Sequence, residues 1–125
     1  MDHDALAALT RSLAATGIRG FVVCGSTGEA ASLDPDEQLA CLHTVAAHAG
    51  GLPLIVYDIP YRTGATLARE TLLALAAHPH IRAVKDCGGD SGKTLALLAD
   101  GRLEVLAGED LQIFGHLAQG AVGAI

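Results

Sequence analysis

The chain has 125 residues, with 14 Asp and Glu against 8 Lys and Arg, and half of its residues are hydrophobic. This length allows one small domain, and the apolar content excludes a disordered chain. The basic residues form no cluster, which argues against a nucleic-acid partner. No stretch is long and apolar enough to predict a membrane helix, and the acidic N-terminus predicts no signal peptide.

The first predicted element is a helix in which Leu6, Leu9 and Leu13 recur at spacings of three and four. Such a spacing places the three leucines on one face of the helix. Gly17 ends the helical pattern. The apolar run over residues 20–24 then predicts a short strand.

The second helix begins with a strong start signal. Asp34 is placed to cap it, Pro35 takes the first helical position, and Glu37 follows three residues after the cap. The glycine pair at residues 50 and 51 ends it. Its predicted apolar face consists of Leu39, Leu42, Val45 and Ala46.

The rest of the chain repeats the same alternation of short apolar runs and helical periods. The runs lack the polar alternation of half-exposed strands, so they predict parallel strands buried on both faces. We therefore expect one α/β domain over residues 1–125, with right-handed crossovers. The predicted strands are residues 52–57, 81–85, 103–107 and 121–125, and the helices are residues 67–77, 92–99 and 110–118.

Lys85 is the most informative residue, because it ends a strand whose other residues are mostly apolar. In α/β proteins with parallel sheets, catalytic and ligand-binding residues lie at the carboxyl ends of the strands. Burial there favours the neutral amine, which can attack a carbonyl and form a Schiff base. The structural alternative is a lysine that extends to water or pairs with Asp86.

Tyr57 and Arg62 follow the preceding strand. A phenol at a strand end can relay protons to a bound carbonyl or imine, and a guanidinium can hold a carboxylate with two hydrogen bonds. The alternatives are an aromatic side chain that only fills space and an arginine that only contacts water.

The loop after the first strand reads Gly25-Ser26-Thr27-Gly28. Its two hydroxyls and accessible backbone N–H groups could hold a carboxylate or phosphate, although an ordinary glycine-rich turn has the same composition. The loop matches neither a P-loop nor a dinucleotide-binding fingerprint.

The cysteines and histidines predict no metal site. Cys24, Cys41 and Cys87 are odd in number and widely spaced, which is typical of core thiols in a reducing cytoplasm. The six histidines do not form a ligand set by spacing.

Four motifs together resemble the dihydrodipicolinate synthase / N-acetylneuraminate lyase family. The motifs are Gly25-Ser26-Thr27-Gly28-Glu29, Tyr57-Asp58-Ile59-Pro60-Tyr61-Arg62-Thr63-Gly64, Val84-Lys85-Asp86 and Gly108-Glu109-Asp110. The resemblance implies part of a (β/α)₈ barrel and a lyase that joins pyruvate to an aldehyde or releases an aldehyde in the reverse direction. It implies no cofactor beyond the lysine–pyruvate imine, and a cytoplasmic homo-oligomer.

The resemblance also implies roles for individual residues. Lys85 corresponds to the lysine that forms the Schiff base, and Tyr57 to the catalytic tyrosine. Ser26 and Thr27 correspond to the hydroxyl pair that holds the pyruvate carboxylate and joins the proton relay. Arg62 corresponds to the arginine of the synthase branch that receives the carboxylate of the second substrate. Gly108 and Ile125 correspond to pocket-lining positions.

The chain departs from the family pattern in its length. Residues 1–50 resemble the region of the second barrel strand, and residues 51–125 resemble the fifth to eighth strands, so the seam lies near residues 49–52. The missing middle carries a second catalytic tyrosine in the family, and Tyr61 does not match that motif. Five strands cannot close the usual barrel, and open parallel edges favour association.

Three functional hypotheses follow. The first is a pyruvate-dependent Schiff-base lyase or synthase. The second is an inactive remnant or an α/β domain that binds small anions through residues 25–28. The third is a flavodoxin-like or receiver-like domain, which the residues after the first strand disfavour because receiver chemistry uses acidic side chains there.

Overall fold

The computed structural model describes residues 1–125 and all of their side chains except that of Pro35. Its five strands form one parallel sheet in the order β1-β2-β3-β4-β5, which confirms the predicted α/β fold. No helix among the described residues is both long and apolar enough to cross a membrane. The elements are α1 (His3–Ala14), β1 (Phe21–Val22), η1 (Ser26–Gly28), η2 (Ala30–Ser32), α2 (Pro35–His48), β2 (Leu54–Asp58), α3 (Pro60–Thr63), α4 (Arg69–Leu75), β3 (Ile81–Asp86), α5 (Ser91–Asp100), β4 (Glu104–Ala107), η3 (Asp110–Gln112), α6 (Ile113–Gln119) and β5 (Gly123–Ala124).

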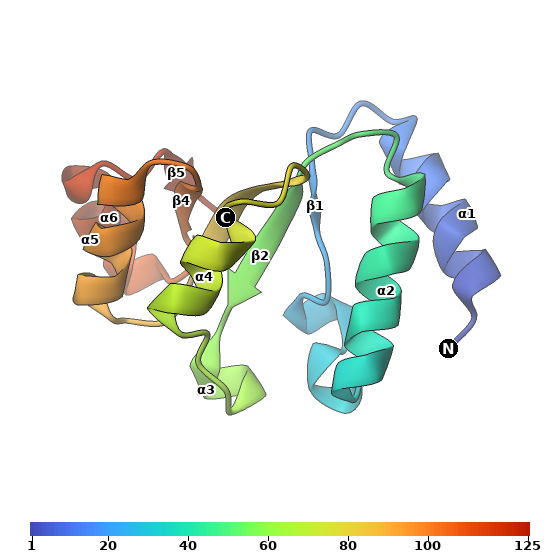
Figure 1. Cartoon of the computed structure of the whole chain (residues 1–125), viewed down its shortest axis with the longest axis horizontal. Helices are drawn as coiled ribbons and strands as arrows, with labels where there is room; N and C mark the ends of the chain where they lie inside the picture. The colour runs from blue at the N-terminus through green and yellow to red at the C-terminus, as the bar shows by residue number, and fades with distance from the viewer.

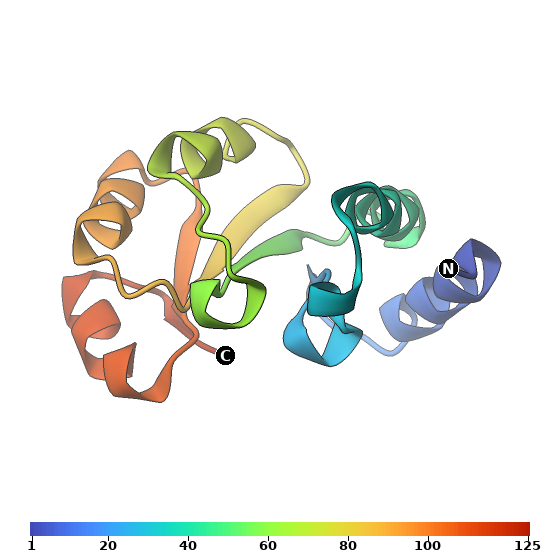
Figure 2. The same cartoon turned by 90° about the horizontal axis from the view of Figure 1, so that it is seen from below.

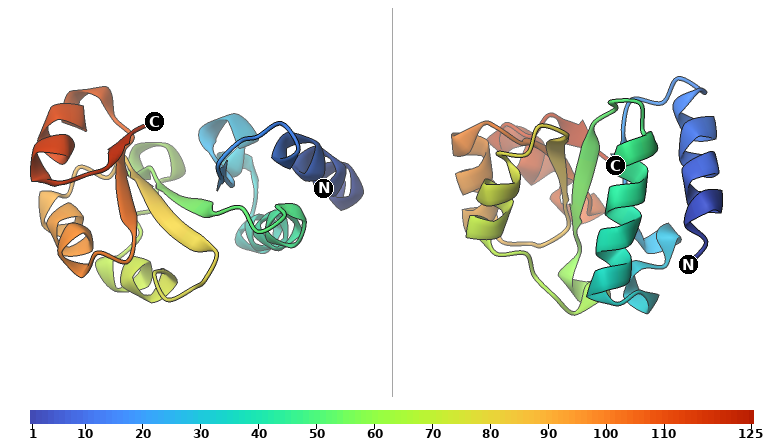
Figure 3. Two further views of the ribbon diagram at one scale, coloured as in Figure 1. Left: turned by 90° about the horizontal axis from the view of Figure 1, so that it is seen from above. Right: turned by 45° about the vertical axis from the view of Figure 1, so that its right-hand side comes forward.

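The sheet is curved and open (Figure 1). Seen from below, α4, α5 and α6 form an arc around its convex side, and the C-terminus lies toward the concave side (Figure 2). Helices α2 and α1 extend away from this arc, as the view from above also shows (Figure 3). The two edge strands are β1 and β5. This arrangement is an incomplete barrel with one open side.

The main core lies between the convex face of the sheet and helices α4 and α5. Leu72 from α4 and Leu97 from α5 are almost fully buried against Val84 of β3 and Val105 of β4. Burying an aliphatic side chain of this size contributes roughly 1.5–3 kcal/mol. This core holds β3 and β4 in place, and with them the strand ends that carry the candidate site.

The N-terminal part of the chain, from α1 to α2, is joined to the remaining strands by a short stretch of sheet. Strand β1 pairs with β2 only through Phe21 with Leu54 and Val22 with Ile55. A second cluster, in which Val45 packs near Leu54, supports this junction. Residues 50 and 51, which follow α2, both have positive φ angles (64° and 83°), so the glycine pair provides the turn into β2.

Helix α2 begins as predicted. The Asp34 side chain accepts a hydrogen bond from the Glu37 amide at 2.8 Å, and the Glu37 carboxylate accepts one from the Asp34 amide at 3.2 Å. The leucine face of α1 is not covered along its length, because Leu9 and Leu13 are exposed and the buried side chains of this helix are Ala7 and Thr10. The leucines line an open cleft instead of packing under a further layer.

Two differences from the predicted elements affect the site. The loop after β2 contains the short helix α3, which Pro60 begins and Gly64 ends with a φ of 71°. The predicted helix over residues 110–118 consists of η3 followed by α6. Helix α3 matters more, because it places Tyr61 and Arg62 at the carboxyl end of the sheet.

Candidate functional site

Tyr57 and Lys85 lie side by side at the carboxyl ends of β2 and β3. They are register partners in the parallel ladder, and both are partly buried. The Lys85 Nζ atom lies over the Tyr57 ring, 4.5 Å from its centroid. The sheet therefore places a primary amine against a phenol, although the sequence predicted only that each lies at a strand end.

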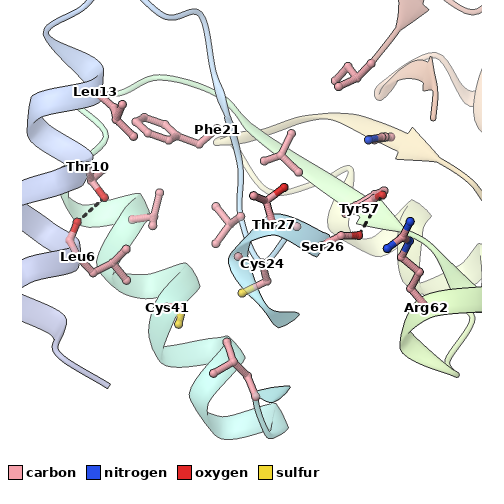
Figure 4. Close-up of a pocket in the computed structure, with 18 of the residues that line it drawn as sticks. Leu6, Thr10, Leu13, Phe21, Cys24, Ser26, Thr27, Cys41, Tyr57 and Arg62 are labelled. Atoms are coloured by element: carbon pink, nitrogen blue, oxygen red, sulfur yellow. Dashed lines mark hydrogen bonds between the residues drawn. The ribbon is translucent and has the colours of Figure 1, made fainter. Parts of the chain in front are cut away.

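The loop after β1 brings a hydroxyl to the same place. Ser26 Oγ and Tyr57 Oη are 3.4 Å apart, and either atom can donate the hydrogen bond (Figure 4). Positive φ angles at Cys24 (53°) and Glu29 (56°) turn the chain sharply on both sides of the loop. These turns keep Ser26 and Thr27 exposed at the edge of the cleft.

Helix α3 contributes the cationic group. The Arg62 guanidinium points toward Ser26 and Tyr57 (Figure 4), and its Cζ atom lies 5.8 Å from the centroid of the Tyr61 ring. Tyr61 Oη donates a hydrogen bond to Glu109 Oε2 at 2.9 Å, and this bond raises the pKa of the Tyr61 phenol above its ordinary value. The Tyr61–Glu109 contact joins α3 to the loop after β4.

Gly108 lies directly beside Lys85. Its amide donates a hydrogen bond to the Asp86 carbonyl at 2.9 Å. A Cβ atom here would overlap Cys87 Sγ and would lie 2.8 Å from Lys85 Cγ. A residue with any side chain at position 108 would crowd the aliphatic part of Lys85. Glycine is therefore required here for steric reasons as well as for the turn.

All seven residues singled out from the sequence line one open cleft of about 900 Å³. These seven residues bring one amine, one phenol, two aliphatic hydroxyls and one guanidinium to the cleft, while α1 and β1 supply apolar side chains on its other side. Such a set can bind a small carboxylate and place a carbonyl carbon near an amine. The seven residues are Ser26, Thr27, Tyr57, Arg62, Lys85, Gly108 and Ile125.

Sequence reasoning missed a buried polar cluster behind these residues. Asp58 and Asp86, the next residues after Tyr57 and Lys85, are 1% exposed and contact Lys93, Thr94 and His116. Strand alternation could have placed both carboxylates on the face away from the cleft. Nothing in the spacing indicated which helical side chains would meet them.

The cysteines are free thiols. Burial, with a smaller contribution from the neighbouring Cys41, raises the pKa of Cys24 to about 11. Burial also raises the pKa of Cys87. Among the described residues, no three His, Cys, Asp or Glu side chains gather as a metal site would require.

Cys24 is expected to be a slow nucleophile at pH 8. A pKa about two units above the ordinary value of 9.0 lowers its thiolate fraction roughly 100-fold. Iodoacetamide labelling, read from the Cys24 peptide by mass spectrometry, should reach its half-maximal rate near pH 11 in the folded chain. In urea the midpoint should return to about 9, and equal midpoints in the two states would contradict the assignment.

The dihydrodipicolinate synthetase family model matches residues 42–125. The 4-hydroxy-tetrahydrodipicolinate synthase 2 of Streptomyces coelicolor is 43% identical over 91 residues, which are 73% of this chain and 30% of that protein. The 4-hydroxy-tetrahydrodipicolinate synthase of Kineococcus radiotolerans is also 43% identical over 91 residues, which are 73% of this chain and 30% of that protein. The matched region thus spans about a third of the length of these curated relatives.

Solved structures show the same fold. A dihydrodipicolinate synthase from Cyanidioschyzon merolae with lysine bound superimposes with a TM-score of 0.64 at 20% identity, covering 99% of this chain and 63% of that one. A chloride-inhibited enzyme from Acinetobacter baumannii complexed with pyruvate gives 0.61 at 23% identity, covering 100% of this chain and 64% of that one. The curved parallel sheet is therefore shared with part of these barrels.

Proposed function

Because the chain belongs to the dihydrodipicolinate synthetase family, we propose that Lys85 forms a Schiff base with pyruvate and that the bound carbon then joins an aldehyde. The observation that carries this proposal is the Lys85 amine lying 4.5 Å from the centroid of the Tyr57 ring at paired strand ends. An amine beside a phenol supplies both the nucleophile and the proton carrier that imine chemistry uses.

The reaction runs through an imine and an enamine. The neutral Lys85 amine attacks the keto carbon of pyruvate, and water leaves as the C=N bond forms. The protonated imine withdraws electrons, so the methyl group loses a proton and gives an enamine. The enamine carbon attacks the aldehyde carbon, forming the C–C bond, and hydrolysis of the imine then restores Lys85. Tyr57, with Ser26 as hydrogen-bonding neighbour, carries protons at the carbinolamine and aldehyde oxygens.

We assign the carboxylates of the two substrates to different groups around this pair. Ser26 and Thr27 offer hydroxyls for the pyruvate carboxylate, and Thr27 joins the proton relay. Arg62 receives the carboxylate of the aldehyde substrate through its guanidinium. Gly108 and Ile125 shape the wall of the cleft.

We also propose that residues 1–50 correspond to the second-strand region of the family barrel and residues 51–125 to its fifth to eighth strands. Two features support a seam at this point: the glycine turn at residues 50 and 51, and the pairing of β2 with β1 through only two residues of each strand. Because β1 and β5 leave the sheet open, we propose that the chain works as a homo-oligomer that covers these edges.

We propose that the reaction needs no cofactor beyond the covalent imine between Lys85 and pyruvate. We also propose that the protein works in the cytoplasm. The free thiols support a reducing compartment. A second candidate function is binding of small anions by residues 25–28 without turnover, which the open sheet favours.

Trapping with pyruvate and borohydride separates the two candidates. The chain has only two lysines, and Lys93 is buried in an ion pair, so Lys85 is the accessible one. The wild type should gain one reduced pyruvate adduct by intact mass, and Lys85→Ala should gain none. Thermal stabilisation by pyruvate without an adduct would favour the anion-binding function instead.

A further inference from the structure

Two carboxylates lie behind the reacting pair. Asp58 and Asp86 are register partners, as are Tyr57 and Lys85 one residue earlier in the same strands. Successive side chains of a strand point to opposite faces, so the carboxylates lie on the face away from the cleft. Each is 1% exposed, although an isolated charge at such depth is strongly disfavoured.

Lys93 from α5 compensates the charge of Asp58. Its Nζ atom donates to Asp58 Oδ2 in an ion pair whose side chains are 3% and 1% exposed. The same Nζ atom donates to the Leu67 carbonyl at 3.2 Å, and the Leu67 amide donates to Asp58 Oδ1 at 3.2 Å. The end of β2 is thereby tied to α5 and to the segment before α4.

Asp86 is bound in a similar way at the end of β3. The Thr94 hydroxyl of α5 donates to Asp86 Oδ2 at 2.6 Å, and the Gly88 amide donates to Oδ1 at 2.8 Å. The His116 Nε2 atom of α6 lies 3.3 Å from Oδ2, and its Nδ1 atom lies 3.0 Å from the Gln112 carbonyl. Asp86 thus turns away from Lys85 and toward two helices.

The consecutive residues Lys93 and Thr94 therefore connect one helix to the ends of both site-bearing strands. A buried ion pair adds little net stability, because desolvation offsets much of the attraction. Its hydrogen bonds nevertheless fix direction and distance, which apolar contacts do not. The strand ends held in this way are the two that carry the amine and the phenol.

We propose that Asp58, Lys93, Asp86 and Thr94 are positioning residues that hold Tyr57 against Lys85. The inference rests on the proposed function only in naming these two as the reacting groups. The contact itself, with Lys85 Nζ over the Tyr57 ring, is a property of the folded chain and can be measured without turnover.

The test uses the double variant Asp58→Asn/Lys93→Met. It removes both charges, while Asn keeps an acceptor for the Leu67 amide and Met keeps the apolar stem, so the melting temperature should stay near that of the wild type. In the wild type, the ring current of Tyr57 should shift the Lys85 Hε resonances upfield. In the double variant this shift should fall by at least about half if the ion pair fixes the ring.

The rate of adduct trapping gives the second measurement. At saturating pyruvate the double variant should react about 10-fold more slowly or worse, with little change in the half-saturating concentration, because geometry and not binding is altered. Thr94→Val, which removes one hydroxyl and no charge, should show the same effects more weakly and provides the test if the double variant does not fold. Arg102→Met, which breaks the exposed ion pair with Asp100, is the control and should change neither measurement.

The possible failures can be told apart. A wild type that shows the Lys85 shift but no adduct would contradict the proposed function and leave the positioning intact. A folded double variant with an unchanged Lys85 shift and unchanged trapping rate would overturn the positioning role. A wild type without the upfield shift would overturn it as well.

Discussion

Replacing Tyr57 with phenylalanine is expected to slow adduct formation about 100-fold or more. The substitution keeps the ring beside Lys85 but removes the Oη atom that lies 3.4 Å from Ser26 Oγ. General acid–base catalysis by a positioned group contributes typically about 10²–10⁴-fold, and the phenol is the group placed to supply it here. The measurement is the rate of borohydride-trapped adduct at saturating pyruvate.

Tyr61→Phe is the matched control for this loss. Tyr61 also has a hydroxyl near the cleft, but it is 62% exposed and donates to Glu109 instead of contacting Lys85. Removing it should change the trapping rate by less than about 3-fold, since an exposed hydrogen bond contributes little. Equal losses in the two variants would show that the hydroxyl of Tyr57 has no special role.

Replacing Gly108 with alanine is expected to damage both the fold and the site. The added Cβ would overlap Cys87 Sγ and crowd Lys85 Cγ at 2.8 Å. Overpacking of this kind costs typically about 1–3 kcal/mol of unfolding free energy, and the shift needed to relieve it moves the Lys85 stem. Urea unfolding gives the first effect, and the trapping rate, which should fall about 10-fold or more, gives the second.

Two further variants test the steric cause. Gly115→Ala lies in α6 with open space around its added Cβ, so it should stabilise the chain by about 0.5–1 kcal/mol through helix propensity. Gly108→Ala/Cys87→Ala removes the closest clash and should recover part of the lost stability. Stability as low in the double variant as in Gly108→Ala would argue against the overlap with Cys87.

The strand ends could be predicted from the sequence because parallel sheets expose the same end of every strand. That rule alone places Lys85, Tyr57 and the loop at residues 25–28 at one edge. It does not give the register, which includes an irregularity between Leu54 and Ile55. The direct pairing of Tyr57 with Lys85 depends on that register and on the core beneath it.

Long-range pairing of polar side chains could not be predicted. Lys93 looks like an exposed helical lysine in the sequence, and only the packing of α5 on the sheet buries it against Asp58. The exposure of Leu9 could not be predicted for a similar reason. Helical spacing shows which side chains share one face of a helix, but it does not show whether another element packs on that face. The start of α2 was predictable because a capping box is made of neighbours in the sequence.

The most direct test of the central claim locates the trapped adduct in the chain. After reaction with pyruvate and borohydride, the digested protein should carry the mass of pyruvate less one water plus two hydrogens on the peptide that contains Lys85. The peptide with Lys93 and the N-terminal peptide should stay unmodified at the same pyruvate concentration. An adduct spread over all three amines, or none at Lys85, would contradict the assignment of Lys85 as the Schiff-base lysine.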